Sequence, residues 1–225
     1  MTTHQIVPAA LLTLADGRFP AGGHAHSGGV EVAVADGTVH DVASLYEFLH
    51  GRLHTTGLTQ AALAAAAADA ADPAGLDAHA DARHPAAVQR RVSRAQGRAV
   101  LRAGRAAWPA PVLEALAVGC PDGPHHAVAL GAVAAAAELS PGHAALAITY
   151  GTVTGPASAA LRLLGLDPYG VHGVIARLGE DCERVAAQAA ACIDEPWADL
   201  PAATGPLSDL AAIRHEHWEV RLFAS

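Results

Sequence analysis

Two histidines and a glutamate in a glycine-rich stretch near the start of the chain are the first residues whose types suggest chemistry. The stretch reads FPAGGHAHSGGVE and spans residues 19–31. In an extended segment residues i and i+2 share a face, so His24 and His26 can bind one metal ion, with Glu31 as a third ligand. The alternative, favoured because an isolated HxH pattern is a weak metal signature, is a turn permitted by glycine that enters a helix near Val30. A nucleotide-binding loop is disfavoured, because the GxxxxGK[ST] pattern is missing and the chain contains no lysine.

The other histidines form no recognisable catalytic motif. His125 and His126 are adjacent, so on a helix they point about 100° apart and do not chelate one ion together. His215 and His217 flank Glu216, but HEH lacks the one-turn spacing of the zinc-protease motif HExxH and predicts at most a weak, transient Ni²⁺ or Zn²⁺ contact. A GxSxG nucleophile motif is also missing. We therefore expect no enzymatic activity and no bound cofactor.

A row of arginines is the most distinctive charge pattern. Residues 85–107 contain no acidic residue, although the chain as a whole carries a formal charge of −8. Like charges one helical turn apart repel, so this row requires a compensating acidic group. That group is either an Asp or Glu elsewhere in the chain or an acidic protein partner, and the sequence leaves both open. The row recurs every three to four residues and consists of Arg91, Arg94, Arg98, Arg102 and Arg105.

Helical patterns must position these side chains, because apolar residues recur at helical spacing and alanine is abundant. Residues 73–84 and 195–209 are expected to be irregular, and Gly57 is expected to end the first predicted helix. The predicted fold class is all-α: a single globular helical-bundle domain over residues 1–225 with flexible N- and C-terminal segments. The predicted helices are 41–56, 58–71, 86–107, 125–139, 143–165 (one or two helices, kinked near Gly155-Pro156) and 171–194.

Composition narrows the setting of the protein. The acidic balance argues against nucleic-acid binding. Cys120, Cys182 and Cys192 form no CxxC pair, and this odd, sparse set predicts a reduced, cytoplasmic protein. The start of the chain lacks the features of a signal peptide, and the longest uncharged run, 139–161, is broken by Pro and Gly, so no membrane association is expected.

Several stretches resemble the UreF family of urease accessory proteins. LLTLADGRFPAGGHAHSGGVE is similar to the family's N-terminal signature, SRAQGRAVLR to its Ser-x-x-x-Gly-Arg helix, and HEHWEVRLFAS to its C-terminus. The chain departs from the family at His24, where an aromatic is usual, at Ala224, where Arg is common, and at GLDPYGVHG, where Pro-Leu-Gly-Gln is typical. The matching residues of the first signature are Pro20, Gly22, His26, Ser27, Gly29 and Glu31.

The resemblance implies a non-enzymatic, cytoplasmic, homodimeric chaperone scaffold. Such a scaffold bridges the D/H-type urease accessory protein and the G-type nickel GTPase on apo-urease, for GTP-dependent nickel insertion. It also implies partner-binding segments at residues 1–30 and 210–225, which become ordered on the D/H-type partner. The alternative function is a histidine-using nickel- or zinc-binding protein or metal-dependent enzyme, with His24 and His26 as weak candidate ligands. The predicted partner-binding residues are Pro20, Gly22, His24, His26, Ser27, Glu31, Arg94, Arg98, Arg221, Leu222 and Phe223.

Overall fold

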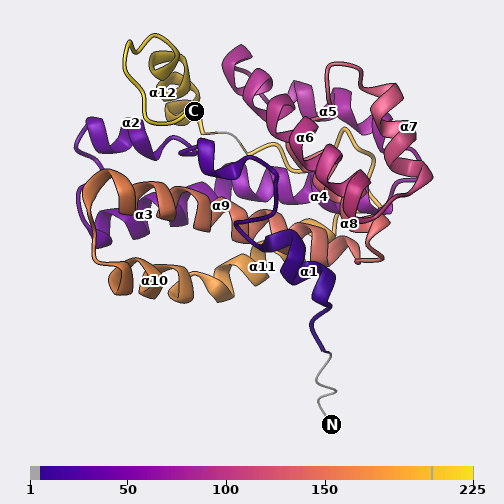
Figure 1. Cartoon of the computed structure of the whole chain (residues 1–225), viewed down its shortest axis with the longest axis horizontal. Helices are drawn as coiled ribbons and strands as arrows, with labels where there is room; N and C mark the ends of the chain where they lie inside the picture. The colour runs from indigo at the N-terminus through magenta and orange to yellow at the C-terminus, as the bar shows by residue number, and fades with distance from the viewer. Residues whose placement is uncertain (1–5, 204, 225) are drawn as a thin grey trace.

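The fold is all-α, as the computed structural model in Figure 1 shows for residues 6–203 and 205–224. No strand occurs among these described residues, and the predicted single helical domain is confirmed. Short 3₁₀ turns at Gly23–Ala25 and Pro73–Leu76 and a π-turn at Leu53–Gly57 join the α-helices. The helices are α1 (Ala9–Ala15), α2 (Val30–Ala35), α3 (Val42–Arg52), α4 (Leu58–Asp69), α5 (Asp77–Ala82), α6 (Ala87–Ala107), α7 (Pro111–Gly119), α8 (His126–Ala136), α9 (Pro141–Leu164), α10 (Pro168–Arg177), α11 (Gly179–Ala190) and α12 (Pro206–Glu216).

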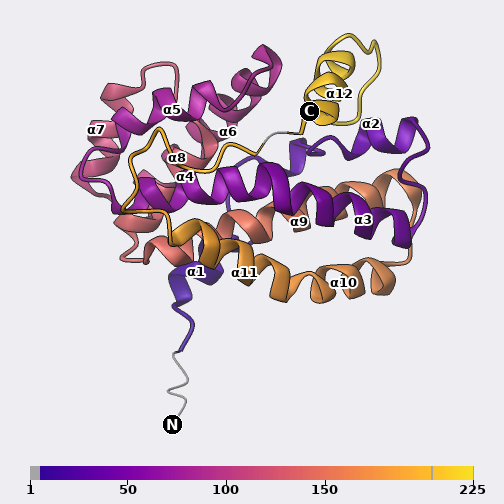
Figure 2. The same ribbon diagram turned by 180° about the vertical axis from the view of Figure 1, so that it is seen from behind.

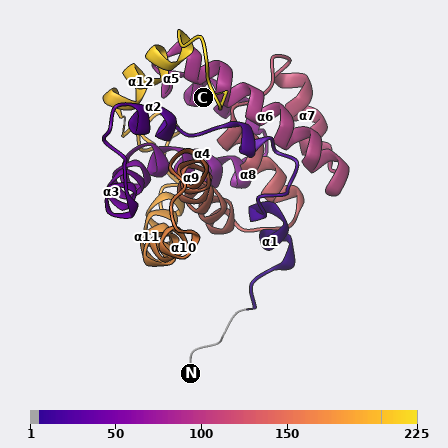
Figure 3. The ribbon, with the colours of Figure 1, turned by 60° about the vertical axis from the view of Figure 1, so that its left-hand side comes forward.

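Two long helical runs form the centre of the molecule. Helices α3 and α4 lie in line through the π-turn, and α9 runs beside them (Figure 2). Figure 3 shows α4 and α9 surrounded by the other helices. Small residues let α4 and α8 approach closely, because Gly131 of α8 faces the alanines of α4 and a Cβ added at Gly131 would lie 2.2 Å from the carbonyl oxygen of Ala64. The alanine-rich composition is therefore used for close helix–helix contact.

The apolar core consists of two clusters that share α9. The first joins α4, α6, α7 and α8 and includes the fully buried Leu63, Leu113 and Leu116. The second joins α2, α3, α10 and α11 and includes Leu45 and Leu49. Because α9 contributes residues to both clusters, the clusters form one continuous domain. Within the described residues no helix combines the length and the apolar character that a membrane crossing requires.

Four predicted boundaries were wrong. Gly57 does not end a helix, because it adopts right-handed φ and ψ (−60° and −48°) and the chain continues into α4. The segment 73–84 is not a loop but contains a 3₁₀ turn and α5, and the predicted helix 171–194 is two helices that meet at Leu178. Part of the predicted irregular segment and tail forms α12, which packs against α2 and α6. The segment 143–165 forms a single helix with Pro156 inside it, which is one of the two predicted forms, whereas α7 was not predicted.

Candidate functional site

The glycine-rich stretch is a turn that leads into α2, which begins at Val30 as the turn interpretation predicts. Gly22, Gly28 and Gly29 have φ angles of 74°, 61° and 89°, in the left-handed region that favours glycine. Ser27 is fully buried, and its Oγ accepts a hydrogen bond from the backbone N–H of Gly29 at 3.3 Å. These residues therefore shape the entry to α2.

The C-terminal segment docks on this turn through the buried carboxylate of Glu31. Its Oε1 accepts a hydrogen bond from the backbone N–H of Leu222 at 2.8 Å. Its Oε2 accepts one from the backbone N–H of Phe223 at 3.2 Å and lies 2.8 Å from Nε2 of His215. We call residues 22–31 together with residues 215–224 the terminal junction. Three donors from one end of the chain thus converge on one carboxylate near the other end.

Further contacts join the two halves of the terminal junction to each other and to α9. The backbone N–H of Ala224 donates to the carbonyl oxygen of Ala25 at 2.7 Å. Arg162 of α9 donates from Nη2 to the carbonyl oxygen of His24 at 3.1 Å. The same guanidinium lies 4.6 Å from the centroid of the Phe223 ring, within the range of a cation–π interaction. Arg162 therefore binds both halves of the terminal junction at once.

The predicted partner-binding residues of the two ends divide into buried and exposed groups. Ser27, Glu31 and Phe223 are buried inside the terminal junction, whereas Leu222 is 74% exposed. Because both oxygens of Glu31 accept hydrogen bonds within the chain, Glu31 is not a third ligand for His24 and His26. Those two histidines belong to no group of three ligand-type side chains in the described part of the chain. Residues 1–5 and Ser225, which the predicted terminal segments include, lie outside the described residues.

Apolar side chains are exposed on and beside α12. Figures 1 and 2 both show α12 next to α2. Helix α7 lies at the opposite end of the molecule in both views. Helical spacing places three of these side chains along one side of α12, and two more follow in the C-terminal segment. Together they give α12 and the C-terminal half of the terminal junction an exposed apolar surface. They are Leu207, Leu210, Ile213, Val220 and Leu222.

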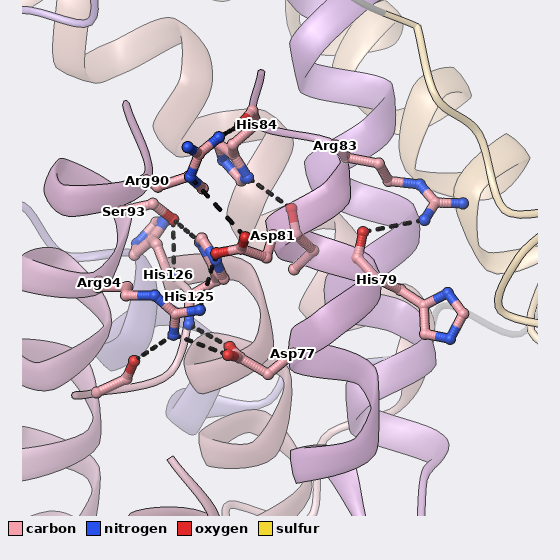
Figure 4. A network of polar contacts seen from close by, with 12 residues as sticks. Asp77, His79, Asp81, Arg83, His84, Arg90, Ser93, Arg94, His125 and His126 are labelled. Atoms are coloured by element: carbon pink, nitrogen blue, oxygen red, sulfur yellow. Dashed lines mark hydrogen bonds and ion pairs between the residues drawn. The ribbon is translucent and has the colours of Figure 1, made fainter. Parts of the chain in front are cut away.

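Acidic residues of the chain itself compensate much of the arginine row. For Arg94 the compensating groups are aspartates elsewhere in the chain, the first of the two alternatives that the sequence left open. Its guanidinium donates to Asp77 Oδ2 at 2.7 Å and to Asp81 Oδ1 at 2.9 Å (Figure 4). It also donates to the carbonyl oxygen of Gly123 at 2.8 Å. The two aspartates lie one turn apart on α5, in the segment that was predicted to be a loop. Arg94, predicted as a partner-binding residue, is thus bound inside the chain.

The other arginines of the row differ in their partners. Arg91 pairs with Glu216 of α12, and Arg105 donates to both carboxylate oxygens of Glu114 at 2.7 and 2.5 Å. Arg98 donates to the carbonyl oxygen of Asp122 at 2.5 Å rather than to a carboxylate. The charges of Arg91 and Arg105 are therefore balanced within the chain.

A serine, a histidine and an aspartate also meet in this region, which the sequence did not predict (Figure 4). Nδ1 of His125 lies 3.0 Å from Ser93 Oγ, and its Nε2 lies 3.1 Å from Asp81 Oδ1. Burial, together with the stacked ring of His84, lowers the pKa of His125 to about 4, so the ring is neutral near pH 7. Because a carboxylate only accepts hydrogen bonds, Nε2 carries the proton and Nδ1 accepts from the serine hydroxyl. The Ser93 oxygen in turn accepts from the backbone N–H of His126 at 3.1 Å.

This arrangement is suited to holding α6 against the start of α8. Ser93 is 6% exposed and His125 is fully buried, so the hydroxyl has little access to a substrate. A Cβ added at Gly97 would lie 1.9 Å from the carbonyl oxygen of Pro124, so only glycine allows this approach. The Ser-x-x-x-Gly spacing therefore has a structural explanation: the serine anchors the segment and the glycine one turn later makes room for it.

Comparisons with known proteins agree with this architecture. A family model described as UreF matches residues 39–179. The chain is 46% identical over 221 residues to a protein of Mycolicibacterium vanbaalenii named "Urease accessory protein UreF", with 96% of this chain and 98% of that protein covered. Proteins of the same name are similar in Mycobacterium sp. strain JLS (47% over 216 residues, 96% and 97% covered) and Mycobacterium tuberculosis strain H37Rv (45% over 220 residues, 96% and 98% covered).

Proposed function

Because the chain belongs to the UreF family of urease accessory proteins, we propose that it is a non-enzymatic chaperone scaffold in urease maturation. In this proposal it bridges the D/H-type accessory protein and the G-type nickel GTPase on apo-urease, so that nickel insertion is coupled to GTP hydrolysis. It acts in the cytoplasm as a homodimer. The similarity to urease accessory proteins over nearly the whole chain is the observation that carries the proposal.

The apolar surface around the terminal junction supports a docking role for this end of the molecule. Exposed apolar groups that gather on one region are typical of protein interfaces. Leu222 projects from a segment whose backbone is fixed by Glu31, so its side chain is presented at low conformational cost. We propose that the D/H-type partner binds over Leu222 and the exposed side of α12.

A pull-down with single substitutions tests this proposal. The chain, tagged at its N-terminus, is co-expressed with its D/H-type and G-type neighbours as the wild type and as Leu222→Glu. The substitution retains the backbone N–H that Glu31 binds, whereas deletion of residues 221–225 would remove it. Val118→Glu is the matched control, because Val118 is 83% exposed on α7 at the opposite end.

We expect Leu222→Glu to lose the D/H-type partner, because a buried interface does not accept an unpaired carboxylate. Val118→Glu is expected to retain both neighbours. Equal recovery of the D/H-type partner by both variants would refute the proposed docking surface. Failure of the wild type to bind either neighbour would refute the scaffold function itself.

A further inference from the structure

We propose that His50, His54 and Asp181 form a binding site for one divalent late first-row transition-metal ion, with Ni²⁺ and Zn²⁺ as the ions to test. One ligand-type atom from each residue lies within 4.8 Å of the others, the one such group of three among the described residues. The site is distinct from the terminal junction and from His24 and His26. It gives the chain a metal-binding property that a purely bridging scaffold does not require.

The backbone places the two histidines side by side. His50 and His54 are one helical turn apart, so they project from the same side of the run formed by α3 and the π-turn. Their ring centroids are 4.6 Å apart. The π-turn Leu53–Gly57 includes His54, and such turns inside helices often occur at functional sites. The pair is therefore organised by local backbone geometry.

The third ligand comes from a helix distant in the sequence. Asp181 lies in the first turn of α11, which packs against the π-turn. Its Oδ1 is 3.7 Å from Nε2 of His54. The carboxylate is largely buried whereas the His54 side chain is 38% exposed, so the group opens to solvent on the histidine side. An ion can therefore reach the three ligands from outside.

The donor set and its spacing suit a small transition-metal ion. Imidazole nitrogen binds Zn²⁺ and Ni²⁺ well, and a carboxylate adds a negative charge that favours a divalent cation. Ligand atoms at about 2.0–2.2 Å from one ion lie roughly 3–3.5 Å apart, so the three side chains must close by about 1 Å. Side-chain rotations supply such a movement at an exposed position. Three protein ligands leave further coordination positions for water or for a donor from another molecule.

Arg184 is the competitor for the same carboxylate. It forms an ion pair with Oδ1 of Asp181, the oxygen that faces His54. The Arg184 side chain is 64% exposed, so it can rotate into solvent when a cation binds. Removal of this arginine is therefore expected to strengthen metal binding. A purely structural histidine pair would not respond in this way.

Isothermal titration calorimetry of the full chain with NiCl₂ and, separately, ZnCl₂ at pH 7.5 tests the site. We expect the wild-type chain, in which all three ligands are present, to bind one ion per chain. His54→Ala and Asp181→Asn are each expected to weaken binding about tenfold or more, because loss of even an outer-shell partner of a metal ligand typically costs about 10- to 100-fold in affinity. Arg184→Ala is expected to strengthen binding about two- to fivefold, the equivalent of one exposed ion pair. His172→Ala, an exposed histidine of α10, is the matched control and is expected to bind like the wild type.

X-ray absorption of the Ni²⁺-loaded chain provides a second measurement, in which two imidazole ligands are expected. Circular dichroism verifies that each variant is folded, and His54→Ala, at an exposed surface position, is the variant least dependent on packing. Wild-type affinity weaker than about 1 mM would overturn the proposal, as would unchanged affinity in both His54→Ala and Asp181→Asn. The pull-down described above needs no added metal, so failure of the metal site is distinguishable from failure of the scaffold function.

Discussion

Replacement of Glu31 by glutamine tests how the two ends of the chain are held together. Glutamine retains the size of the side chain but replaces one carboxylate oxygen with an NH₂ group. In the wild type, Oε2 faces two donors, the backbone N–H of Phe223 and Nε2 of His215. In Glu31→Gln an amide oxygen at the Oε1 position still accepts from Leu222, while the NH₂ group faces the Phe223 N–H donor to donor, and His215 can accept from the NH₂ group only after its proton moves to Nδ1.

The expected cost follows from these contacts. A buried polar group that loses its hydrogen-bond partner costs about 1–3 kcal/mol, and loss of the charge weakens the remaining bond. We therefore expect the C-terminal segment to be destabilised by about 2–4 kcal/mol. At 1.36 kcal/mol for each factor of ten, this is roughly a 30- to 1,000-fold increase in local opening. The first core cluster includes neither Glu31 nor Phe223 and should retain its stability, whereas the second cluster includes Phe223 and should loosen where that ring packs.

Amide hydrogen exchange measured by NMR checks this prediction residue by residue. The Leu222 and Phe223 amides should exchange faster in Glu31→Gln, while amides of α4 should be unchanged. Asp36→Asn is the matched control, because Asp36 pairs with Arg214 at 2.6 Å between α2 and α12 but is partly exposed. An exposed pair contributes about 0–1 kcal/mol, so this control should alter exchange only slightly. Unchanged protection of both amides in Glu31→Gln would refute the reasoning.

Three further predictions concern stability; the first two are measured by urea unfolding and the third by calorimetry. Gly97→Ala should destabilise the fold by about 2–3 kcal/mol or more, because backbone atoms of Pro124 occupy the place of the added Cβ. The control Gly151→Ala, where the Cβ enters open space beside α9, should stabilise the fold by about 0.5–1 kcal/mol. Higher stability of Gly97→Ala would contradict the close contact between α6 and Pro124. Arg94→Ala should lower the free energy of unfolding by about 2–4 kcal/mol, because it leaves buried acceptors unpaired. Arg102→Ala, at an exposed position of the same helix, should change it by less than about 0.5 kcal/mol. Equal effects of the two substitutions would contradict the internal pairing of Arg94. The pKa of His125 is lowered from 6.5 in the unfolded chain to about 4 in the folded protein, so the unfolded state binds a proton at higher pH than the folded state does. The contribution of neutral His125 to the free energy of unfolding is therefore present above pH 6.5 and is lost as the pH falls from 6.5 to 4. Burial lowers the pKa of His126 to about 4 as well, so calorimetry near pH 5 should detect at least about two protons taken up on unfolding, and the absence of any uptake would contradict the buried neutral rings.

Long periodic segments could be predicted from the sequence because their pattern is local. The predicted helix 86–107 corresponds to α6 (Ala87–Ala107), and the turn interpretation placed the start of α2 at Val30. Gly57 was misread because packing, rather than its intrinsic preference, keeps it helical. Helix α7 was missed although Pro111 stands at its first turn with Glu114 three residues later, an arrangement typical of a helix start.

The polar networks could not be predicted, because no local pattern connects their members. Ser93 and Asp81 are 32 and 44 residues from His125, and Glu31 is 184 residues from His215. Such pairs become neighbours only through the packing of several helices, and the local patterns of one sequence do not show which helices pack together. The compensation of Arg94 was open for the same reason, since α5 was read as a loop. The roles of the predicted partner-binding residues, Pro20 and Arg221 among them, stay predictions.

The terminal junction also has a consequence for the order in which the protein acquires its structure during synthesis. Glu31 leaves the ribosome 191 residues before Leu222. At about 5–20 residues per second, this separation corresponds to roughly 10–40 seconds of translation. Throughout that time the carboxylate has no access to the two backbone donors that later bind it, while the core helices from α3 to α11 are synthesised one after another. The terminal junction therefore cannot be completed before residue 222 is synthesised, and a nascent chain that stalls before residue 222 keeps this carboxylate without those donors.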